Sequence, residues 1–143
     1  MQAGLVDSST RRPSVLVTGC NGYVGRNLIT SLKDTVNFIG VDQVPGDHES
    51  ELIDLRDATS YSRLDQYTFD YVLHCAWDQI SKNIYENNMQ SSRNLFNYLD
   101  QKTLRGLIFI SSSFASTTTG IQYTRSKIAF ENMLFESGIP FVI

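Results

Sequence analysis

The 143-residue sequence has few of the residues that mark extracellular or metal-binding proteins. It contains two cysteines, two histidines, three prolines and one tryptophan. Two cysteines cannot build a disulfide framework. The side chains of Cys20, Cys75, His48 and His74 are too few and too scattered along the chain for a metal cage. We therefore expect reduced, structural thiols and no metal.

A surplus of basic residues and a long apolar run are also missing. The formal net charge is -3, which offers no electrostatic basis for binding nucleic acid or an anionic membrane surface. No apolar run approaches the roughly 20 residues that a transmembrane helix needs. Residues 1–13 are polar, lack the apolar centre of a signal peptide and are expected to be a flexible leader. These features predict a soluble, cytoplasmic protein without a nucleic-acid or membrane partner.

The sequence does have the composition of a globular domain, with 41% hydrophobic and 19% charged residues, and its strand-like and helix-like segments alternate. The expected strands are 14–18, 37–41, a short one around 52–53, 71–76, 107–110 and the beginning of one at 141–143. The expected helices are one after the glycine-rich turn that follows residue 18, a weak one at 55–64, then 87–102 and 123–137. Repeated strand-helix-strand units predict a doubly wound parallel α/β sheet over residues 14–143.

A glycine-rich segment lies between the first expected strand and the first expected helix. Residues 18–25 read TGCNGYVG. Gly19 permits a tight turn, Gly22 lets the backbone approach a pyrophosphate, and Gly25 lets the helix pack closely on the strand. The free N–H groups at the helix N-terminus attract phosphates. Structural turns also collect glycine, but the position between strand and helix favours a dinucleotide-binding loop.

An aspartate, Asp42, ends the second expected strand. A carboxylate there can accept hydrogen bonds from both hydroxyls of an adenosine ribose and would repel a 2′-phosphate, so it favours NAD over NADP. The alternative is a solvated aspartate that supports the turn toward Pro45. After the third strand, Asp54 and Leu55 are placed to reach the adenine ring.

Two residues of the last expected helix have the spacing of a catalytic pair. Tyr123 and Lys127 are four positions apart, so their side chains share one helix face. An ammonium near a phenol favours the phenolate, which can act as a general base, and a lysine can also hold the nicotinamide ribose. The alternative is an exposed helix pair without a chemical role.

Three serines, Ser111, Ser112 and Ser113, follow the strand at 107–110. They lie at its C-terminal end, where ligands bind in open α/β sheets. A hydroxyl there can donate a hydrogen bond to a substrate oxygen, whereas the alternative is a polar transition from strand to loop. We choose Ser112 as the candidate, with Ser113 as the alternative.

Taken together, these segments resemble the extended short-chain dehydrogenase/reductases, and in particular the NAD-dependent epimerase/dehydratase family. The resemblance covers residues 15–143 and rests on TGCNGYVG, the strand end at Asp42, VLHCAW at 72–77, ISSS at 110–113 and YTRSK at 123–127. The segment ENNMQSSRNLF also resembles the family's helix after the fourth strand, where Asn88 and Asn94 match recurrent asparagines.

The resemblance implies a Rossmann-like domain that binds NAD and carries a Ser-Tyr-Lys site. Ser112 would orient the substrate oxygen, Tyr123 would move the proton, and Lys127 would support Tyr123 and bind ribose. It implies hydride transfer to NAD and a small-molecule substrate, a nucleotide-activated sugar, for epimerisation, dehydration or reduction. The cofactor contacts that it implies are Gly19, Gly22, Tyr23, Val24, Gly25, Asp42, Asp54, Leu55, Cys75, Ala76, Trp77, Asn88, Tyr123 and Lys127.

The sequence departs from this family in two places. FASTTTG at 114–120 leaves a short loop between the serines and Tyr123, and the sequence stops where the family continues into a C-terminal substrate lobe. We therefore expect a truncated domain without that lobe, whose exposed apolar strand edge would favour a homo-oligomer. The alternatives to an enzyme are a non-catalytic NAD-binding module and a truncated, inactive fragment.

Overall fold

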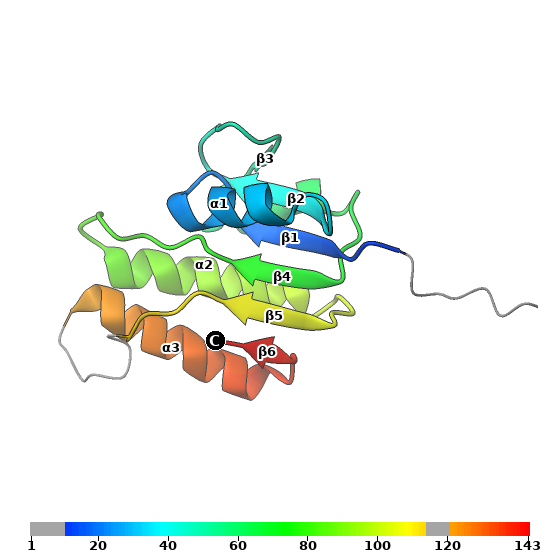
Figure 1. The fold of residues 1–143 in the computed structure, drawn as a ribbon. Coiled ribbons are helices and arrows are strands. Elements are labelled where there is room, and N and C mark those ends of the chain that lie inside the picture. Colours follow the sequence, from blue (N-terminus) through cyan, green and yellow to red (C-terminus); the bar gives the residue numbers. More distant parts are fainter. Residues whose placement is uncertain (1–10, 114–120) are drawn as a thin grey trace, which may run out of the picture.

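A computed structural model describes residues 11–113 and 121–143 and arranges them around a six-stranded, parallel sheet (Figure 1). The strands are β1 (Ser14–Thr18), β2 (Asn37–Asp42), β3 (Glu51–Leu52), β4 (Tyr71–His74), β5 (Gly106–Phe109) and β6 (Phe141–Val142). Their order, β3-β2-β1-β4-β5-β6, reverses direction between β1 and β4. This confirms the doubly wound, Rossmann-like sheet, in which ligands bind at that switch point.

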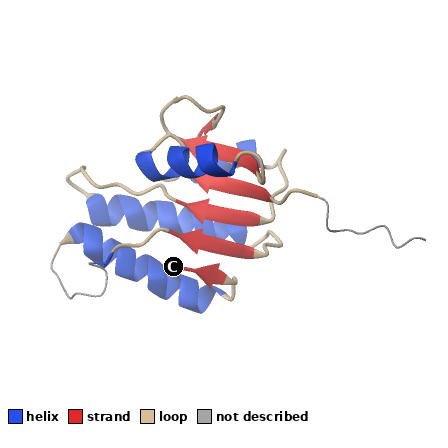
Figure 2. Ribbon diagram, in the orientation of Figure 1, coloured by secondary structure: helices blue, strands red, loops and turns tan. Residues whose placement is uncertain are grey.

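Helices cover the two faces of the sheet unequally (Figure 2). One face carries α1 (Tyr23–Leu32), and the other carries α2 (Ile84–Leu99) and α3 (Gln122–Ser137). A short 3-10 helix, η2 (Ala58–Leu64), joins β3 to β4. α3 stops at Gly138, which has a φ of 71° and adopts the left-handed conformation that ends many helices.

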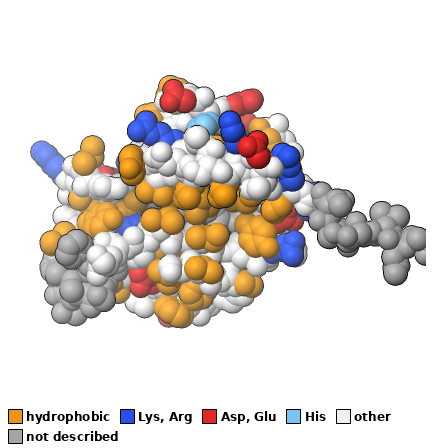
Figure 3. Space-filling view, viewed as in Figure 1, with side chains coloured by type: hydrophobic (Ala, Val, Ile, Leu, Met, Phe, Trp, Pro, Cys, Tyr) orange, Lys and Arg blue, Asp and Glu red, His pale blue; other side chains and the backbone are white. Residues whose placement is uncertain are grey.

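The main core lies between the sheet and the α2–α3 layer. Alternate strand residues face it, among them Leu16, Val72 and Leu107, and α3 contributes Phe130 and Leu134. A smaller cluster beneath α1 contains Val17, Cys20, Ile29 and Leu73. Within the described residues, no helix covers β5 and β6 on the α1 face, where Ile108 is 40% and Val142 63% exposed. Figure 3 shows hydrophobic side chains gathered on this face.

Three expected elements had wrong boundaries. β4 ends at His74 rather than Ala76, since the backbone N–H of Ala76 donates to the side chain of Thr18, at 3.3 Å. The segment 55–64 is helical only from Ala58, because Asp57 caps it through the N–H of Thr59, and it is a 3-10 helix. α2 runs from Ile84 to Leu99, so it begins and ends three residues before the expected 87–102.

The N-terminal segment has defined contacts from Arg11 onward. The guanidinium of Arg11 lies 2.8 Å from a carboxylate oxygen of Asp70, and Asn37 donates its backbone N–H to the carbonyl of Pro13. The rest of the expected leader, residues 1–10, lies outside the described residues, as does the segment 114–120. None of the helices in the described part of the chain has the length and apolarity of a membrane span.

Candidate functional site

The glycine-rich loop after β1 has a backbone path that side chains would block. Gly19 has a φ of 70°, and a Cβ there would lie 2.7 Å from the backbone nitrogen of Ala76. A Cβ at Gly25 would overlap the carbonyl oxygen of Gly19. Cys20 Sγ occupies space beside β2, where a Cβ at Gly40 would lie 2.9 Å from it. The loop therefore brings bare backbone to the end of the sheet, as the approach of a pyrophosphate requires.

A pocket of about 620 Å³ lies at the carboxyl ends of β1, β2 and β4. Its lining combines the glycine loop, the end of β2, the segment after β3, the segment after β4 and the start of α2. All the predicted cofactor contacts except Tyr123 and Lys127 line it: Gly19, Gly22, Tyr23, Val24, Gly25, Asp42, Asp54, Leu55, Cys75, Ala76, Trp77 and Asn88. The fold thus brings these separate segments together at the switch point of the sheet.

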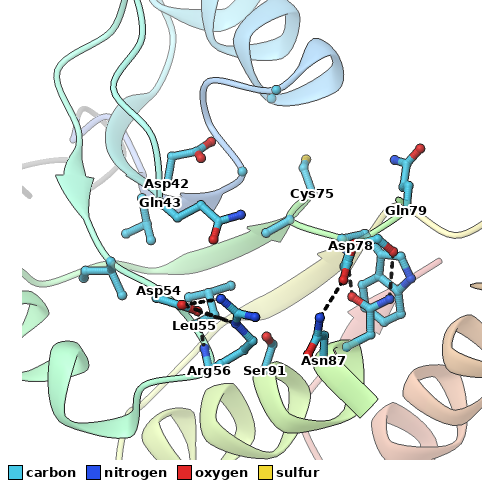
Figure 4. A pocket seen from close by; sticks show the side chains of 18 of the residues that line it. Asp42, Gln43, Asp54, Leu55, Arg56, Cys75, Asp78, Gln79, Asn87 and Ser91 are labelled. Carbon is cyan, nitrogen blue, oxygen red and sulfur yellow. Dashed lines mark hydrogen bonds and ion pairs between the residues drawn. The ribbon is translucent and has the colours of Figure 1, made fainter. Parts of the chain in front are cut away.

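Asp42 and Gln43 lie along one side of the pocket (Figure 4). One carboxylate oxygen of Asp42 accepts the backbone N–H of Asn21 at 3.0 Å, and the other accepts the N–H of Val44 at 3.3 Å. These bonds fix the carboxylate against the glycine loop. Gln43 was not predicted, although its position directly after Asp42 was a usable signal.

The segment after β3 contributes an ion pair to the pocket. Arg56 Nη2 lies 2.7 Å from Asp54 Oδ2, and the guanidinium Nε also donates to Oδ1 at 3.0 Å (Figure 4). The hydrogen bonds from Arg56 lower the pKa of Asp54. Arg56 was not predicted, because nothing in the sequence separates it from other surface arginines. In the structure its guanidinium is paired with the carboxylate of Asp54.

The opposite end of the pocket is built on Asp78, which was not predicted either. Its carboxylate accepts hydrogen bonds from the hydroxyl and backbone N–H of Ser81, from the N–H of Ile80 and from the amide of Asn87. Burial raises the pKa of Asp78, but these bonds outweigh it and lower the pKa to about 2. The segment after β4 is therefore a closed turn held by a charged carboxylate.

Asn88 is buried, with 3% of its surface exposed, and locks this turn to α3. Its side-chain oxygen accepts the N–H of Asp78 at 2.8 Å. Its amide nitrogen donates to the carbonyl of Asp78 at 3.0 Å and to the hydroxyl of Ser126 at 3.3 Å. Asn88 lines the pocket, but its hydrogen bonds are made within the protein.

Tyr123 and Lys127 are brought close to each other, and neither is among the residues that line the pocket. Lys127 Nζ is 5.6 Å from the centre of the Tyr123 ring and donates to the carbonyl of Ile110 at 2.5 Å. Lys127 is only 4% exposed, and this burial lowers its pKa to about 8. Their predicted role in proton transfer and cofactor binding remains a prediction.

The predicted serines lie in a second, open hollow of about 560 Å³. Ser112 and Ser113 line it together with Ser111, Glu131 and Ile143. The hydroxyl of Ser111 donates to the carboxylate of Glu131. The structure therefore places Ser112 at the carboxyl end of β5, as predicted, but in a hollow separate from the pocket of the glycine loop.

Several solved structures are similar to this chain over about half of their own length. The solved structures similar to this chain include the Bordetella bronchiseptica enzyme WbmG in complex with NAD and UDP, at 19% identity and a TM-score of 0.80, over 95% of this chain and 53% of that chain. Another is UDP-glucose 4-epimerase from Bifidobacterium longum in complex with NAD+ and UDP, at 21% identity and a TM-score of 0.76, over 86% of this chain and 48% of that one. A short-chain dehydrogenase/reductase superfamily protein from Agrobacterium tumefaciens with bound NAD has 20% identity and a TM-score of 0.74, over 85% and 44%.

At these identities the likeness shows the fold, and the chain spans about half the length of these structures. A search of curated protein sequences found no significant match. The sequence profile of the NAD dependent epimerase/dehydratase family matches residues 15–138, which is most of the chain. With the parallel sheet and the glycine-lined pocket, this match shows that the chain belongs to the NAD dependent epimerase/dehydratase family.

Proposed function

We propose that the chain is the cofactor-binding part of an NAD-dependent epimerase, dehydratase or reductase, and that NAD binds in the 620 Å³ pocket. The observation that carries this proposal is the joint lining of that pocket by the glycine loop and Asp42. The loop presents backbone where Cβ atoms at Gly19 and Gly25 would collide with other main-chain atoms. The carboxylate of Asp42 is held at the end of β2 by the N–H of Asn21, and there it would accept hydrogen bonds from the adenosine ribose and favour NAD over NADP.

Bound NAD would supply the hydride acceptor of the reaction. Tyr123 would move the proton of the substrate hydroxyl, and Lys127 would stabilise the phenolate of Tyr123. Ser112 would orient the substrate oxygen from the end of β5. A nucleotide-activated sugar is the proposed substrate, in keeping with the UDP bound in two of the similar structures.

A non-catalytic NAD-binding module is the second candidate. It is favoured by the separation of Ser112 from the glycine-loop pocket and by the bond that Lys127 makes to the carbonyl of Ile110. A binding module needs the glycine loop and Asp42, but it needs neither a placed serine nor a tyrosine base.

Calorimetric titration of the purified chain with NAD and with NADP tests the cofactor assignment. We expect NAD to bind about ten-fold more tightly than NADP, which corresponds to about 1.4 kcal/mol. Absence of binding to a chain that is folded by circular dichroism would contradict the proposal.

Incubation of the NAD-loaded chain with UDP-sugars, followed by NADH fluorescence, then separates the two candidates. NADH formation that Tyr123→Phe abolishes supports the enzyme, since this variant keeps the ring and removes only the hydroxyl. NAD binding without any NADH formation supports the module.

A further inference from the structure

The side chain of Asn21, in the glycine loop after β1, contacts the loop 43–50 between β2 and β3 at three places. Its Nδ2 donates to the carbonyl of Val44 at 2.8 Å, near the start of that loop, and to the hydroxyl of Ser50 at 3.3 Å, at its end. In the middle of the loop, a Cβ at Gly46 would lie 2.4 Å from Asn21 Cγ. A single amide group thus links the glycine loop to both ends and the middle of the loop 43–50.

The backbone of these residues also holds the carboxylate of Asp42. Asn21 donates its backbone N–H to Asp42 Oδ2 at 3.0 Å, and Val44 donates its backbone N–H to Asp42 Oδ1 at 3.3 Å. Val44 therefore accepts a hydrogen bond from the Asn21 side chain and donates one to Asp42. Both oxygens of the carboxylate are held by groups that Asn21 supplies or positions.

The orientation of the Asn21 amide is set by its acceptors and by the close fit to Gly46. The carbonyl of Val44 can only accept a hydrogen bond, so the nitrogen of the amide faces it. Asn21 Oδ1 is buried on the other side, where a Cβ at Gly46 would lie 2.5 Å away. The loop therefore leaves room for this amide only because residue 46 has no side chain.

The orientation of the Asp42 carboxylate decides what it can accept from a ligand. A carboxylate has about four lone-pair sites, and the N–H groups of Asn21 and Val44 take two of them. Hydrogen bonds weaken steeply when their angles change, so the other sites suit the ribose hydroxyls only while the carboxylate stays in place. A loop that is already held in its binding conformation also loses less entropy when the ligand binds.

We propose that the side chain of Asn21 is a positioning residue for cofactor recognition. It fixes the loop 43–50 and, through Val44, orients the Asp42 carboxylate for the hydroxyls of the adenosine ribose. The Asn21 side chain acts through Asp42 and not through a cofactor contact of its own. The inference rests on the proposed function, since it takes NAD as the occupant of the pocket that Asp42 lines.

Hydrogen exchange of the unliganded chain, followed by NMR, tests whether Asn21 holds the loop. The amide of Val44 is the reporter, because its N–H is bonded to Asp42. In Asn21→Ala we expect this amide to exchange about ten-fold faster, since the loop loses its link to the side chain. Asn132→Ala removes an amide from an exposed position of α3 and should leave the rate unchanged. An unchanged rate in a folded Asn21→Ala overturns the proposal.

Calorimetric titration with NAD tests the path through Asp42. We expect Asn21→Ala to weaken NAD binding about five-fold in the unmodified chain. In Asp42→Ala the same change should weaken it less than about two-fold, because the group that Asn21 positions is already gone. General loosening of the chain would weaken binding equally in both backgrounds, and that result overturns the proposal.

Gly46→Ala displaces the Asn21 amide without removing it, and it keeps the test available if Asn21→Ala does not fold. Its backbone is not in the left-handed region, so the added Cβ acts on its neighbours alone. We expect a loss of NAD affinity of about five-fold, as in Asn21→Ala. Added to Asn21→Ala, the change should cost less than about two-fold, because the space is vacated. Equal losses in both backgrounds contradict the proposal.

Failure of this inference can be told from failure of the proposed function. If the unmodified chain and a folded Asn21→Ala bind NAD equally well, Asn21 has no positioning role and the NAD site stands. If the folded, unmodified chain binds no NAD, the proposed function fails and this inference fails with it.

Discussion

The backbone N–H of Asn21 donates a hydrogen bond to a carboxylate oxygen of Asp42, 3.0 Å away. This bond joins the glycine loop after β1 to the end of β2, two segments that together form one side of the pocket. Asp42 therefore shapes the loop in addition to its proposed role in ribose recognition.

Replacement of Asp42 should affect cofactor affinity more than folding. We expect Asp42→Asn, which keeps one acceptor oxygen for Asn21, to weaken NAD binding about ten-fold and to bring the affinity for NADP close to that for NAD. Calorimetry with both dinucleotides measures the change. Asp47→Ala removes a charge from the exposed loop after β2 and should leave both affinities unaltered. Unchanged selectivity in Asp42→Asn would remove Asp42 from the site.

The same glycine-to-alanine change should have different effects at two positions. Gly25→Ala places a Cβ against the main chain of Gly19 and Cys20, so we expect a loss of about 3 kcal/mol of stability and of NAD binding. Gly138→Ala meets no atom within 4 Å, and its φ of 71° costs only about 1 kcal/mol. Urea unfolding and NAD titration compare the variants, and equal effects would refute the steric argument.

His74 should make the fold sensitive to mild acid. Burial, with a smaller effect of the Lys127 charge, lowers its pKa to about 3. As the pH falls below about 6.5, the unfolded chain gains a proton that the folded chain does not, so stability falls by about 1.4 kcal/mol per pH unit down to about pH 3. Above pH 6.5 this dependence disappears.

Urea unfolding at pH 7, 6 and 5 measures the effect of His74. His74→Phe, which can still pack against Phe109 and Phe130, should flatten the profile relative to the unmodified chain. His48→Gln removes the other histidine and should keep the slope. If His48→Gln flattens the profile and His74→Phe does not, the assignment of the acid sensitivity to His74 is contradicted.

Asn94 should support the adenine end of the pocket from a distance. Its buried amide donates to the carbonyls of Leu55 and Arg56, at 3.0 and 2.8 Å. Asn94→Ala leaves both carbonyls without this donor, so we expect a loss of about 2 kcal/mol and weaker NAD binding. Asn97→Ala, on an exposed position of the same helix, should change stability by less than about 0.5 kcal/mol. Thermal unfolding with and without NAD distinguishes the Asn94 variant from the Asn97 variant.

The parts of the site that follow local rules could be predicted from the sequence. Gly19, Gly22 and Gly25 are recognisable because a tight turn and close packing exclude side chains. Asp42 is recognisable because it stands at the end of an expected strand. Arg56 and Asp78 could not be found in this way. Their positions depend on how the segments after β3 and β4 fold back over the sheet, and no periodicity encodes that path.

Lys127 shows how far helix spacing alone can predict a site. The four-residue interval correctly predicts that Tyr123 and Lys127 are neighbours, because it follows from helix geometry. It says nothing of which side chains pack around the pair, since Trp77, whose ring centre lies 4.5 Å from Lys127 Nζ, comes from a different segment. The position of Ser112 after a strand was likewise predicted from the sequence. The hollow that it lines was not, because Glu131 of α3 and Ile143 complete that hollow.

The contact between Cys20 and Gly40 restricts the substitutions that the chain tolerates beneath α1. A Cβ at position 40 would lie 2.9 Å from Cys20 Sγ and 3.1 Å from the backbone carbonyl oxygen of Glu49. A smaller residue at position 20 would relieve only the first of these contacts, so alanine at position 40 also requires the backbone at Glu49 to shift. Glycine at position 40 is therefore expected to persist even among descendants of this sequence that have lost Cys20.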